Sequence, residues 1–405
     1  VVTALNANIK LGNSSMASAL SATVTNLFNH KSLLVKKKSL LAMQKLESVL
    51  PGCISQYREK IKISLQEVEP SVLNTSLNLI LDEAQQNPSA WTCVVKSLCS
   101  ILKQIIEKKM SYYDYQKIPE PYMQIKIIRI LGLLCRKDKV QAVEVAPFIE
   151  QALQRADYIN TDASYAIVFE SALTAASLFF ETSLVEKASL AIGRFLNFNA
   201  VNPNLAYMAI KVLERISEVD SKFIRDYQMF ILESLESPDE TLRRTTLDLL
   251  CKNITAENKN IVISKLLARL CSSNDKSFKV ELSKKIFHLS IEYSDSVVEF
   301  IQKLGMIMNN SPEGLNEEEQ IQGLKIIEEG FNENQALRIP IFEASMSIVS
   351  SNVINSYIMK FISWIIRKVV LSEKADHELK ARIVDIFEFL LESKIEGEVG
   401  YIWVL

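Results

Sequence analysis

The chain has 405 residues, and its 46 lysines and arginines nearly balance its 48 aspartates and glutamates. Apolar residues make up 48%, which excludes a wholly disordered chain. Ten glycines and ten prolines are too few for an all-β protein with a turn about every ten residues. At ~150 residues per domain, the length fits two or three domains or one extended array of repeats.

The first residues, VVTALNANIK, lack an initiator methionine and a basic stretch before an apolar run, so we expect the interior of a longer chain. The best membrane-spanning candidate, FISWIIRKVVL, is interrupted by Arg367 and Lys368, and no transmembrane helix is predicted. The six cysteines are scattered without a CxxC spacing, which is typical of reduced thiols in the cytoplasm.

Apolar residues recur at helical spacing along nearly the whole chain, which predicts about twenty helices of ~12–20 residues and no sheet. An apolar residue, then polar or basic residues, then a leucine-rich stretch recurs every 36–40 residues, apart from one interval lengthened by an insertion at 109–120. The anchors are Val35, Leu73, Ile125, Tyr165, Leu205, Leu242 and Phe278. This period predicts an all-α fold, a HEAT/armadillo-type α-solenoid of antiparallel helix pairs.

The first predicted helices carry an excess of basic over acidic residues. Residues 1–139 hold 19 lysines and arginines against 10 acidic residues, whereas residues 140–405 hold 27 against 38. Lys36, Lys37 and Lys38 are consecutive on a helix and spread over about 200°, so they cannot all face one surface. The candidates for contact with an anionic membrane or an acidic partner are Lys31, Lys36, Lys37, Arg58, Lys60 and Lys62. A solvated helix face is the alternative.

Further along the chain, local signals mark helix starts and one boundary. Four prolines precede helical runs, where proline suits the first turn: Pro70, Pro121, Pro203 and Pro238. Arg243 and Arg244 open a repeat and are predicted to pair with carboxylates of a neighbouring repeat. The polar break NSPEGLNEEE at 310–319 divides a first solenoid stretch, 1–309, from its continuation, 310–405.

The usual signatures of enzymes and metal sites are missing. The sequence has no GxGxxG, no GxxxxGK[ST] and no HExxH, and its three histidines are far apart. Ser273 and Lys276 match SxxK within a polar turn, and Glu317 opens a run of three glutamates that suits a solvated helix start. We therefore predict no catalytic residue, metal or cofactor, and the net charge of −2 argues against nucleic acid. A helical enzyme, the rival class, would need clustered titratable residues.

The block YDYQKIPEPYMQIKIIRIL, Tyr113–Leu131, resembles the large adaptins of the clathrin-adaptor type. Its YDY…P-P form is most similar to the epsilon type of the fourth adaptor-protein complex. Similar blocks follow in the same order at YAIVFES (165–171), EKASLAIGRFL (186–196), NPNLAYMAIKVL (202–213) and YQMFILESLESPDETLRRTTLDLL (227–250). The chain departs from the family at Ala206, where a basic residue is usual, and at Cys135 and Arg136, which replace a glycine-containing turn.

The resemblance implies a non-enzymatic trunk whose first repeats are missing, so none of the family's ligand contacts can be assigned to residues here. It implies pairing with a beta-type large adaptin and with mu and sigma subunits, in a heterotetramer that selects cargo at trans-Golgi or endosomal membranes. An Arf-type small GTPase and an anionic membrane would act through the assembled complex. The alternative is an unrelated HEAT scaffold, such as a coatomer-type subunit or a nuclear transport receptor, which would lack the YDY…PYMQIK block.

Overall fold

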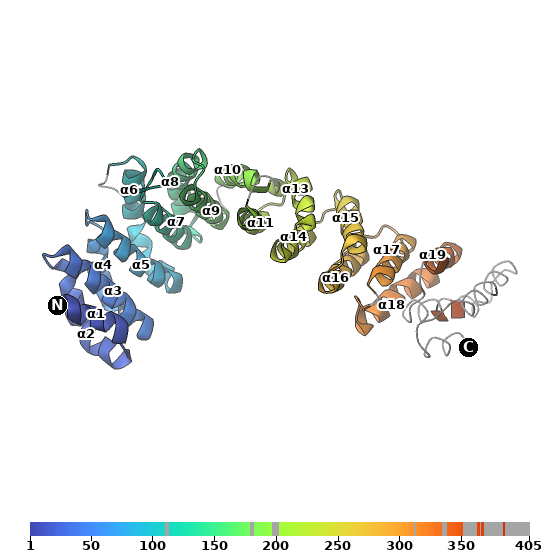
Figure 1. The fold of residues 1–405 in the computed structure, drawn as a ribbon, viewed down its shortest axis with the longest axis horizontal. Coiled ribbons are helices and arrows are strands. Elements are labelled where there is room, and N and C mark those ends of the chain that lie inside the picture. Colours follow the sequence, from blue (N-terminus) through green and yellow to red (C-terminus); the bar gives the residue numbers. More distant parts are fainter. Residues whose placement is uncertain are drawn as a thin grey trace. The chain divides into compact units, whose positions relative to one another are not determined.

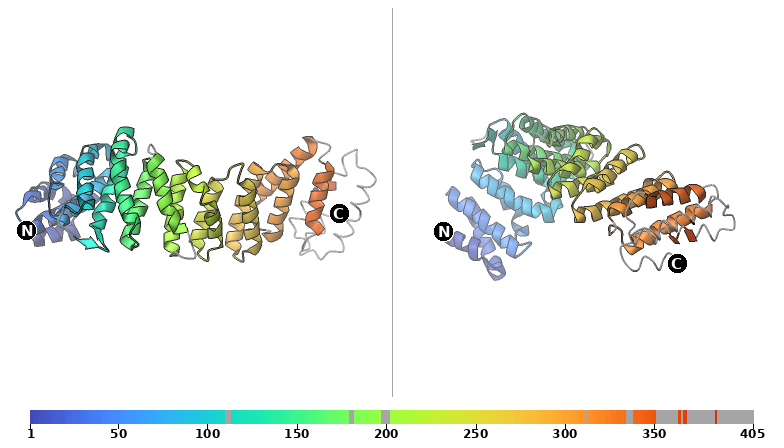
Figure 2. Two further views of the ribbon diagram at one scale, coloured as in Figure 1. Left: turned by 90° about the horizontal axis from the view of Figure 1, so that it is seen from above. Right: turned by 45° about the vertical axis from the view of Figure 1, so that its right-hand side comes forward.

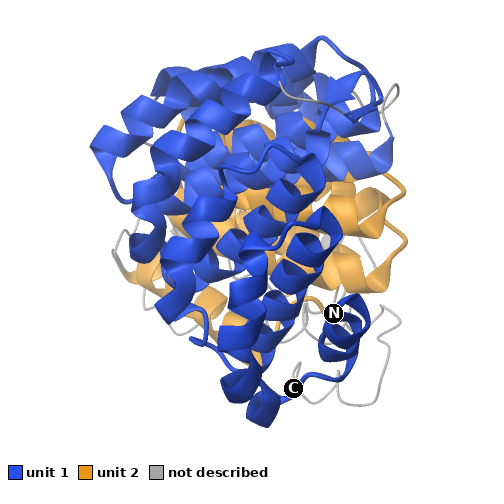
Figure 3. Cartoon of the chain, turned by 90° about the vertical axis from the view of Figure 1, so that its left-hand side faces the viewer, with its two compact units in different colours: residues 1–230 blue, residues 231–405 orange. Residues whose placement is uncertain are grey.

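The computed structural model describes residues 1–109, 113–178, 182–196, 202–311, 313–333 and 338–350, with positions 363, 364, 366, 367 and 384. In these residues it contains nineteen α-helices, short 3-10 turns and one β-hairpin. The chain divides into two compact units, Val1–Phe230 and Ile231–Leu405 (Figure 3), which we call unit 1 and unit 2. Each is described by itself.

Unit 1 is a stack of helices that follow one another in chain order (Figure 1). They are α1 (Val2–Leu11), α2 (Ser14–Asn26), α3 (Leu33–Val49), α4 (Arg58–Ser64), α5 (Pro70–Gln86), α6 (Val95–Ile106), α7 (Pro121–Cys135), α8 (Lys139–Asp157), α9 (Asp162–Ser177), α10 (Thr182–Gly193), α11 (Pro203–Ser217) and α12 (Lys222–Arg225). The division between the units, after Phe230, falls within helix α13 (Gln228–Glu233).

The predicted repeat appears as two layers of helices in unit 1. Helices α3, α5, α7, α9 and α11 pack in series as one layer, and each carries one anchor of the sequence repeat. Helices α6, α8 and α10 pack in series as the second layer, and α7 to α10 each contact the next helix in the chain (Figure 2). The prediction of an α-solenoid of helix pairs is therefore confirmed.

Unit 2 continues with paired helices. They are α14 (Glu240–Lys252), α15 (Lys259–Ser272), α16 (Lys276–Tyr293), α17 (Val297–Asn310), α18 (Glu317–Glu333) and α19 (Arg338–Ser350). Phe278 and Phe287 are fully buried in its core, where α16 packs on α14, α15 and α17. The predicted boundary at 310 coincides with the turn between α17 and α18, and it stays a prediction.

Local sequence explains where the helices begin. Pro70, Pro121 and Pro203 lie in the first turns of α5, α7 and α11, as predicted. Pro238 stands one residue outside the N-cap of α14, where Asp239 Oδ1 accepts the backbone N–H of Leu242 at 2.8 Å. The prolines have no backbone N–H, and the Asp239 side chain accepts one, so fewer N–H groups at these helix starts lack a partner.

The insertion corrects the expectation that the fold has no sheet. Strands β1 (Asp114–Tyr115) and β2 (Ile118–Pro119) pair in an antiparallel hairpin. Its two turn residues, Gln116 (φ 51°) and Lys117 (φ 69°), are both left-handed, as tight hairpin turns require. The Ala163 N–H, in the first turn of α9, donates to Gln116 Oε1 at 2.9 Å and ties the hairpin to the stack. Because neither residue favours this conformation, nothing in the local sequence signals the turn.

Candidate functional site

The six basic residues singled out in the sequence lie on two neighbouring parts of unit 1. Lys31 precedes α3, and Lys36 and Lys37 lie on its first turns. The other three, Arg58, Lys60 and Lys62, lie on α4. Lys31 and Lys60 are exposed, and the remaining four are half-buried. The structure thus gathers the predicted residues on two short helical segments.

Three of these charges are held by local carboxylates. Lys36 forms an ion pair with Glu67. Arg58 Nη2 lies 3.5 Å from Glu83 Oε2, and Lys62 Nζ lies 2.6 Å from Glu59 Oε1. The bond to Glu59 raises the pKa of the Lys62 ammonium above its ordinary value.

The other three are less engaged. Lys60 Nζ donates to the side-chain oxygen of Asn26 at 3.0 Å. In the part of the chain that the structure describes, Lys31 and Lys37 have no ion pair. These two lysines, with Lys60, retain the charge that a surface contact would use.

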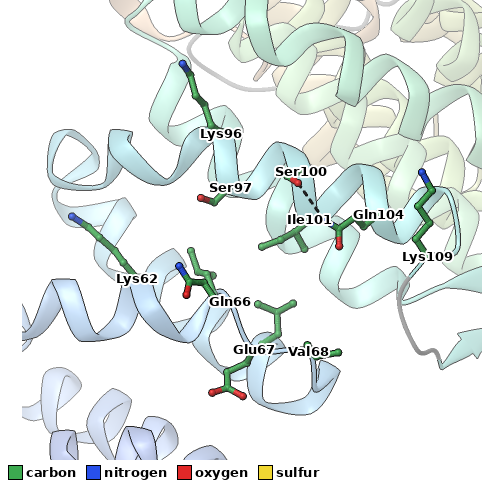
Figure 4. Close-up of a pocket in the computed structure, with 12 residues that line it drawn as sticks. Lys62, Gln66, Glu67, Val68, Lys96, Ser97, Ser100, Ile101, Gln104 and Lys109 are labelled. Atoms are coloured by element: carbon green, nitrogen blue, oxygen red, sulfur yellow. Dashed lines mark hydrogen bonds between the residues drawn. The ribbon is translucent and has the colours of Figure 1, made fainter.

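One of the six, Lys62, borders a polar hollow. It stands at one end of a polar groove of about 550 Å³, formed between the C-terminal end of α4, the turn that follows it and one face of α6 (Figure 4). We call this hollow the α4–α6 groove. It is lined by Lys62, Leu65, Gln66, Glu67, Val68, Leu73, Lys96, Ser97, Ser100, Ile101, Gln104 and Lys109.

The wall that α6 contributes is a polar stripe on a helix whose buried face is apolar. Ser97, Ser100 and Gln104 recur at the three- and four-residue spacing that places side chains on one helix face. Gln104 Nε2 donates to Ser100 Oγ at 3.2 Å. Leu98 and Leu102, on the same helix, are fully buried. In the sequence, the signal for this wall is the spacing of the hydroxyl and amide groups at 97, 100 and 104, which is not a cluster of charges.

Lysines stand at both ends of the α4–α6 groove. Lys62 and Lys96 lie at one end and Lys109 at the other (Figure 4). Lys109 Nζ is 2.5 Å from Glu107 Oε2, whereas Lys96 is exposed and has no ion pair among the described residues. The carboxylate of Glu67 points away from α6 toward Lys36, so it does not cancel the positive charge of the groove.

A second, more apolar hollow of about 240 Å³ lies beside the hairpin. Its walls include buried Ile118 and Ile167, with Tyr158 at the exposed rim. Lys117, one of the left-handed turn residues, also lines it. This hollow is smaller than the ~300–1,000 Å³ typical of sites for small molecules.

The described residues hold no cluster of metal-ligand side chains, and burial makes two of the cysteines poorly reactive. Across the described ranges, no three histidines, cysteines or carboxylates are grouped so that they could hold a metal ion. Burial raises the pKa of Cys99 to about 11 and that of Cys135 to about 12, which keeps both thiols protonated and poorly nucleophilic. Among the helices described, none is both long enough and apolar enough to cross a bilayer.

The predicted pairing of Arg243 and Arg244 with a neighbouring repeat is confirmed. Arg243 Nη2 lies 3.5 Å from Asp275 Oδ2, and Arg244 Nη1 lies 2.9 Å from Glu281 Oε2. Both acceptors belong to the next repeat, at the start of α16 and within it. These arginines therefore serve packing between repeats.

Comparison with known proteins connects this architecture to one family. The chain is 27% identical over 372 residues to AP-4 complex subunit epsilon of Arabidopsis thaliana, covering 90% of this chain and 39% of that protein. It is 27% identical over 393 residues to AP-4 complex subunit epsilon-1 of Homo sapiens, covering 95% and 34%. The chain thus spans little more than a third of the length of these relatives.

A solved structure shares the fold. A chain in a homology model of the full-length AP-3 complex in an intermediate open conformation superposes with a TM-score of 0.63, at 15% sequence identity, over 96% of this chain and 69% of that one. The family described as the adaptin N terminal region matches residues 1–396, nearly the whole length. On this match, together with the stacked helix pairs, the chain belongs to the adaptin family.

Proposed function

We propose that this chain is a non-enzymatic scaffold subunit of a heterotetrameric adaptor coat complex, acting in vesicle-mediated intracellular protein transport. The observation that carries the proposal is the match to the adaptin N-terminal region over residues 1–396. The similarity to two epsilon subunits over 90% and 95% of the chain favours the epsilon type. An unrelated HEAT scaffold is not supported by this match.

The expected partners are a beta-type large adaptin and the mu and sigma subunits. A solenoid that assembles with other subunits leaves apolar side chains at its surface when alone. Leu34 is 52% exposed, Val140 69% and Leu190 64%. Such side chains, on three different helices, are the ones we expect partner subunits to cover.

The assembled complex would act on the cytoplasmic face of trans-Golgi or endosomal membranes, recruited by an Arf-type GTPase and an anionic lipid surface. The basic residues proposed for that surface, or for an acidic partner, are Lys31, Lys36, Lys37, Arg58, Lys60 and Lys62. Of these, Lys31, Lys37 and Lys60 retain the most available charge, since the other three are in ion pairs. We further propose that 1–309 and 310–405 are successive stretches of one trunk.

Co-expression tests the scaffold role. The chain is expressed alone, and together with beta, mu and sigma adaptins from the same source, and each product is analysed by size-exclusion chromatography. We expect the chain alone to associate or precipitate, and the co-expressed chain to elute with its three partners in equal amounts. A monodisperse chain that binds neither sigma nor beta subunits would contradict the proposal.

Liposome co-sedimentation of the assembled complex tests the basic residues. Reversal of charge at Lys31 and Lys37 is expected to weaken binding to phosphoinositide vesicles at low salt, where screening is weak. The matched control is Lys103→Glu on α6, because the Lys103 side chain is 54% exposed and is not among the six proposed residues. Unchanged binding by the double variant Lys31→Glu/Lys37→Glu would exclude the membrane role and leave contact with an acidic subunit.

A further inference from the structure

We propose that the α4–α6 groove is a docking site for an extended, acidic peptide segment of a partner protein. The proposal is independent of the coat function, because it rests on the chemistry of the groove alone. Three features carry it: the length of the polar stripe, the side chains left available along it and the position of the lysines.

The polar stripe has the length of a short extended peptide. Ser97 and Gln104 are seven residues apart on α6, which at 1.5 Å per residue is about 10 Å. An extended chain rises ~3.3 Å per residue, so about three residues lie along the stripe. The volume of about 550 Å³ falls within the ~300–1,000 Å³ range of ligand-binding clefts.

The groove offers hydrogen-bonding groups that the protein itself does not use. Among the described residues, the amide of Gln66 and the hydroxyl of Ser97 have no hydrogen-bond partner, and both side chains border the groove (Figure 4). An amide both donates and accepts, and so does a hydroxyl. They therefore suit the alternating N–H and C=O groups of a peptide backbone.

The floor is apolar enough to bury part of a ligand. Leu65 and Leu73 are buried beneath the groove, and Ile101 is 8% exposed. On the facing wall, Val68 is 73% exposed. A ligand in the groove would cover Val68 and remove its apolar surface from water, which favours binding.

The charges select an acidic ligand. Lys96 has no carboxylate partner in the described part of the chain, and Lys62 stands at the same end. Lys109 marks the opposite end. The single carboxylate among the lining residues, Glu67, is neutralised by Lys36 outside the groove. Lys62 and Lys109 are paired with Glu59 and Glu107, so Lys96 is the lysine whose charge is available to an acidic side chain of a bound segment. An acidic side chain at the opposite end would lie beside the Lys109–Glu107 pair.

The arrangement favours a peptide over a lipid headgroup. Strong phosphate sites direct several donors at one point, whereas these lysines are separated by the length of the polar stripe. The groups between them are uncharged, and they line a hollow that a flat bilayer surface does not enter. The experiment must therefore distinguish binding of a peptide from binding of a membrane surface.

The probe is an array of seven-residue peptides with glutamates near both ends, each paired with a glutamine counterpart. The array is incubated at low salt with the whole chain, alone or in its co-expressed complex, whichever elutes as a single species. The tightest glutamate peptide is then labelled with fluorescein, and its affinity is measured by fluorescence anisotropy. We expect Lys96→Glu to weaken its binding by about tenfold or more. The matched control is Lys103→Glu on the same helix, because Lys103 is 54% exposed and does not line the groove.

A second variant, Ser97→Phe, fills the groove without changing charge and is expected to abolish binding. Lys96 and Ser97 are both exposed, so the melting temperatures of Lys96→Glu and Ser97→Phe should stay near that of the wild type. This measurement separates loss of binding from loss of folding. Equal losses in Lys96→Glu and Lys103→Glu, or equal binding of glutamate and glutamine peptides, would overturn the proposal. So would sensitivity to Lys96→Glu that appears only with phosphoinositide vesicles and never with peptides.

Discussion

Arg129 on α7 and Glu170 on α9 form an ion pair through two hydrogen bonds. It joins helices of two consecutive repeats that lie side by side in the first layer. Arg129 Nε donates to Glu170 Oε1 at 2.9 Å, and Nη2 donates to Oε2 at 2.5 Å. The Arg129 side chain is 48% exposed, whereas that of Glu170 is only 10% exposed. The arginine therefore compensates a carboxylate that the packing of α7 on α9 removes from water.

Removal of the arginine should destabilise unit 1 more than removal of the pair. Arg129→Met leaves the Glu170 carboxylate buried without its partner, which costs about 1–3 kcal/mol. Replacing both groups, as Arg129→Met/Glu170→Met, removes that penalty and should recover most of the loss. Thermal melting followed by circular dichroism checks the order. A double variant that melts no higher than Arg129→Met would contradict this account.

The sequence predicted most of the fold because its signals are local. Hydrophobic spacing places one anchor in each helix of the first layer, and the prolines mark three helix starts. The pairing of Arg243 and Arg244 was also predictable, because neighbouring repeats in a solenoid must touch. Each of these features depends on residues within about one repeat.

The candidate site could be predicted only in part. Of the six basic residues, Lys62 alone borders the α4–α6 groove, and which lysines meet a carboxylate depends on the exact turn after α4. That turn brings Glu67 to Lys36, 31 residues earlier in the chain, and places Gln66 opposite Ser97. No spacing rule in the sequence specifies these approaches, since they follow from how the repeats stack.

The hairpin turn should gain stability when Lys117 is replaced by glycine. Lys117 has φ 69°, a conformation that costs a residue with a Cβ atom about 1 kcal/mol and costs glycine little. Lys117→Gly is therefore expected to raise the melting temperature of unit 1 by ~1–3 °C. The control is Gln116→Ala, which keeps the strain and removes the acceptor of the Ala163 N–H. That control should melt below the wild type, and a lower melting point for Lys117→Gly would show that the turn is not strained.

Gly132 should resist substitution although it lies inside a helix. A Cβ atom at this position of α7 would lie 2.9 Å from Thr174 Cγ2 on α9, closer than two carbons tolerate. Gly132→Ala is therefore expected to lower the free energy of unfolding by about 1 kcal/mol or more. In an ordinary helix the same change raises that free energy by ~1 kcal/mol. Thr174→Ser removes only the clashing methyl group. The double variant Gly132→Ala/Thr174→Ser should melt above Gly132→Ala, and equal melting points would locate the cost elsewhere.

Glu83 on α5 is buried, 4% exposed, in the space between α3, α4 and α5. Burial raises the pKa of its carboxyl group, and the carboxylate of Glu47 beside it raises the pKa further. Glu47 Oε2 in turn accepts the Ile54 N–H at 2.9 Å. Arg58, 3.5 Å from Glu83, offsets part of the effect. The folded chain therefore holds a proton on Glu83 more tightly than the unfolded chain does.

The free energy of unfolding should consequently depend on pH through the carboxyl group of Glu83. Because the folded-state pKa of Glu83 is raised, its stabilising contribution is complete below the unfolded pKa and is lost as the pH rises through the folded pKa. Glu83→Gln imitates the protonated form at every pH. Its melting temperature relative to the wild type is therefore expected to be higher at pH 7.5 than at pH 5, by ~2–4 °C if the effect is about 1 kcal/mol. The control is Gln85→Ala, an exposed amide on the same helix that does not titrate, whose difference from the wild type should not vary over this range. If the Glu83→Gln difference is equally constant, the pKa of Glu83 is not raised in the folded chain.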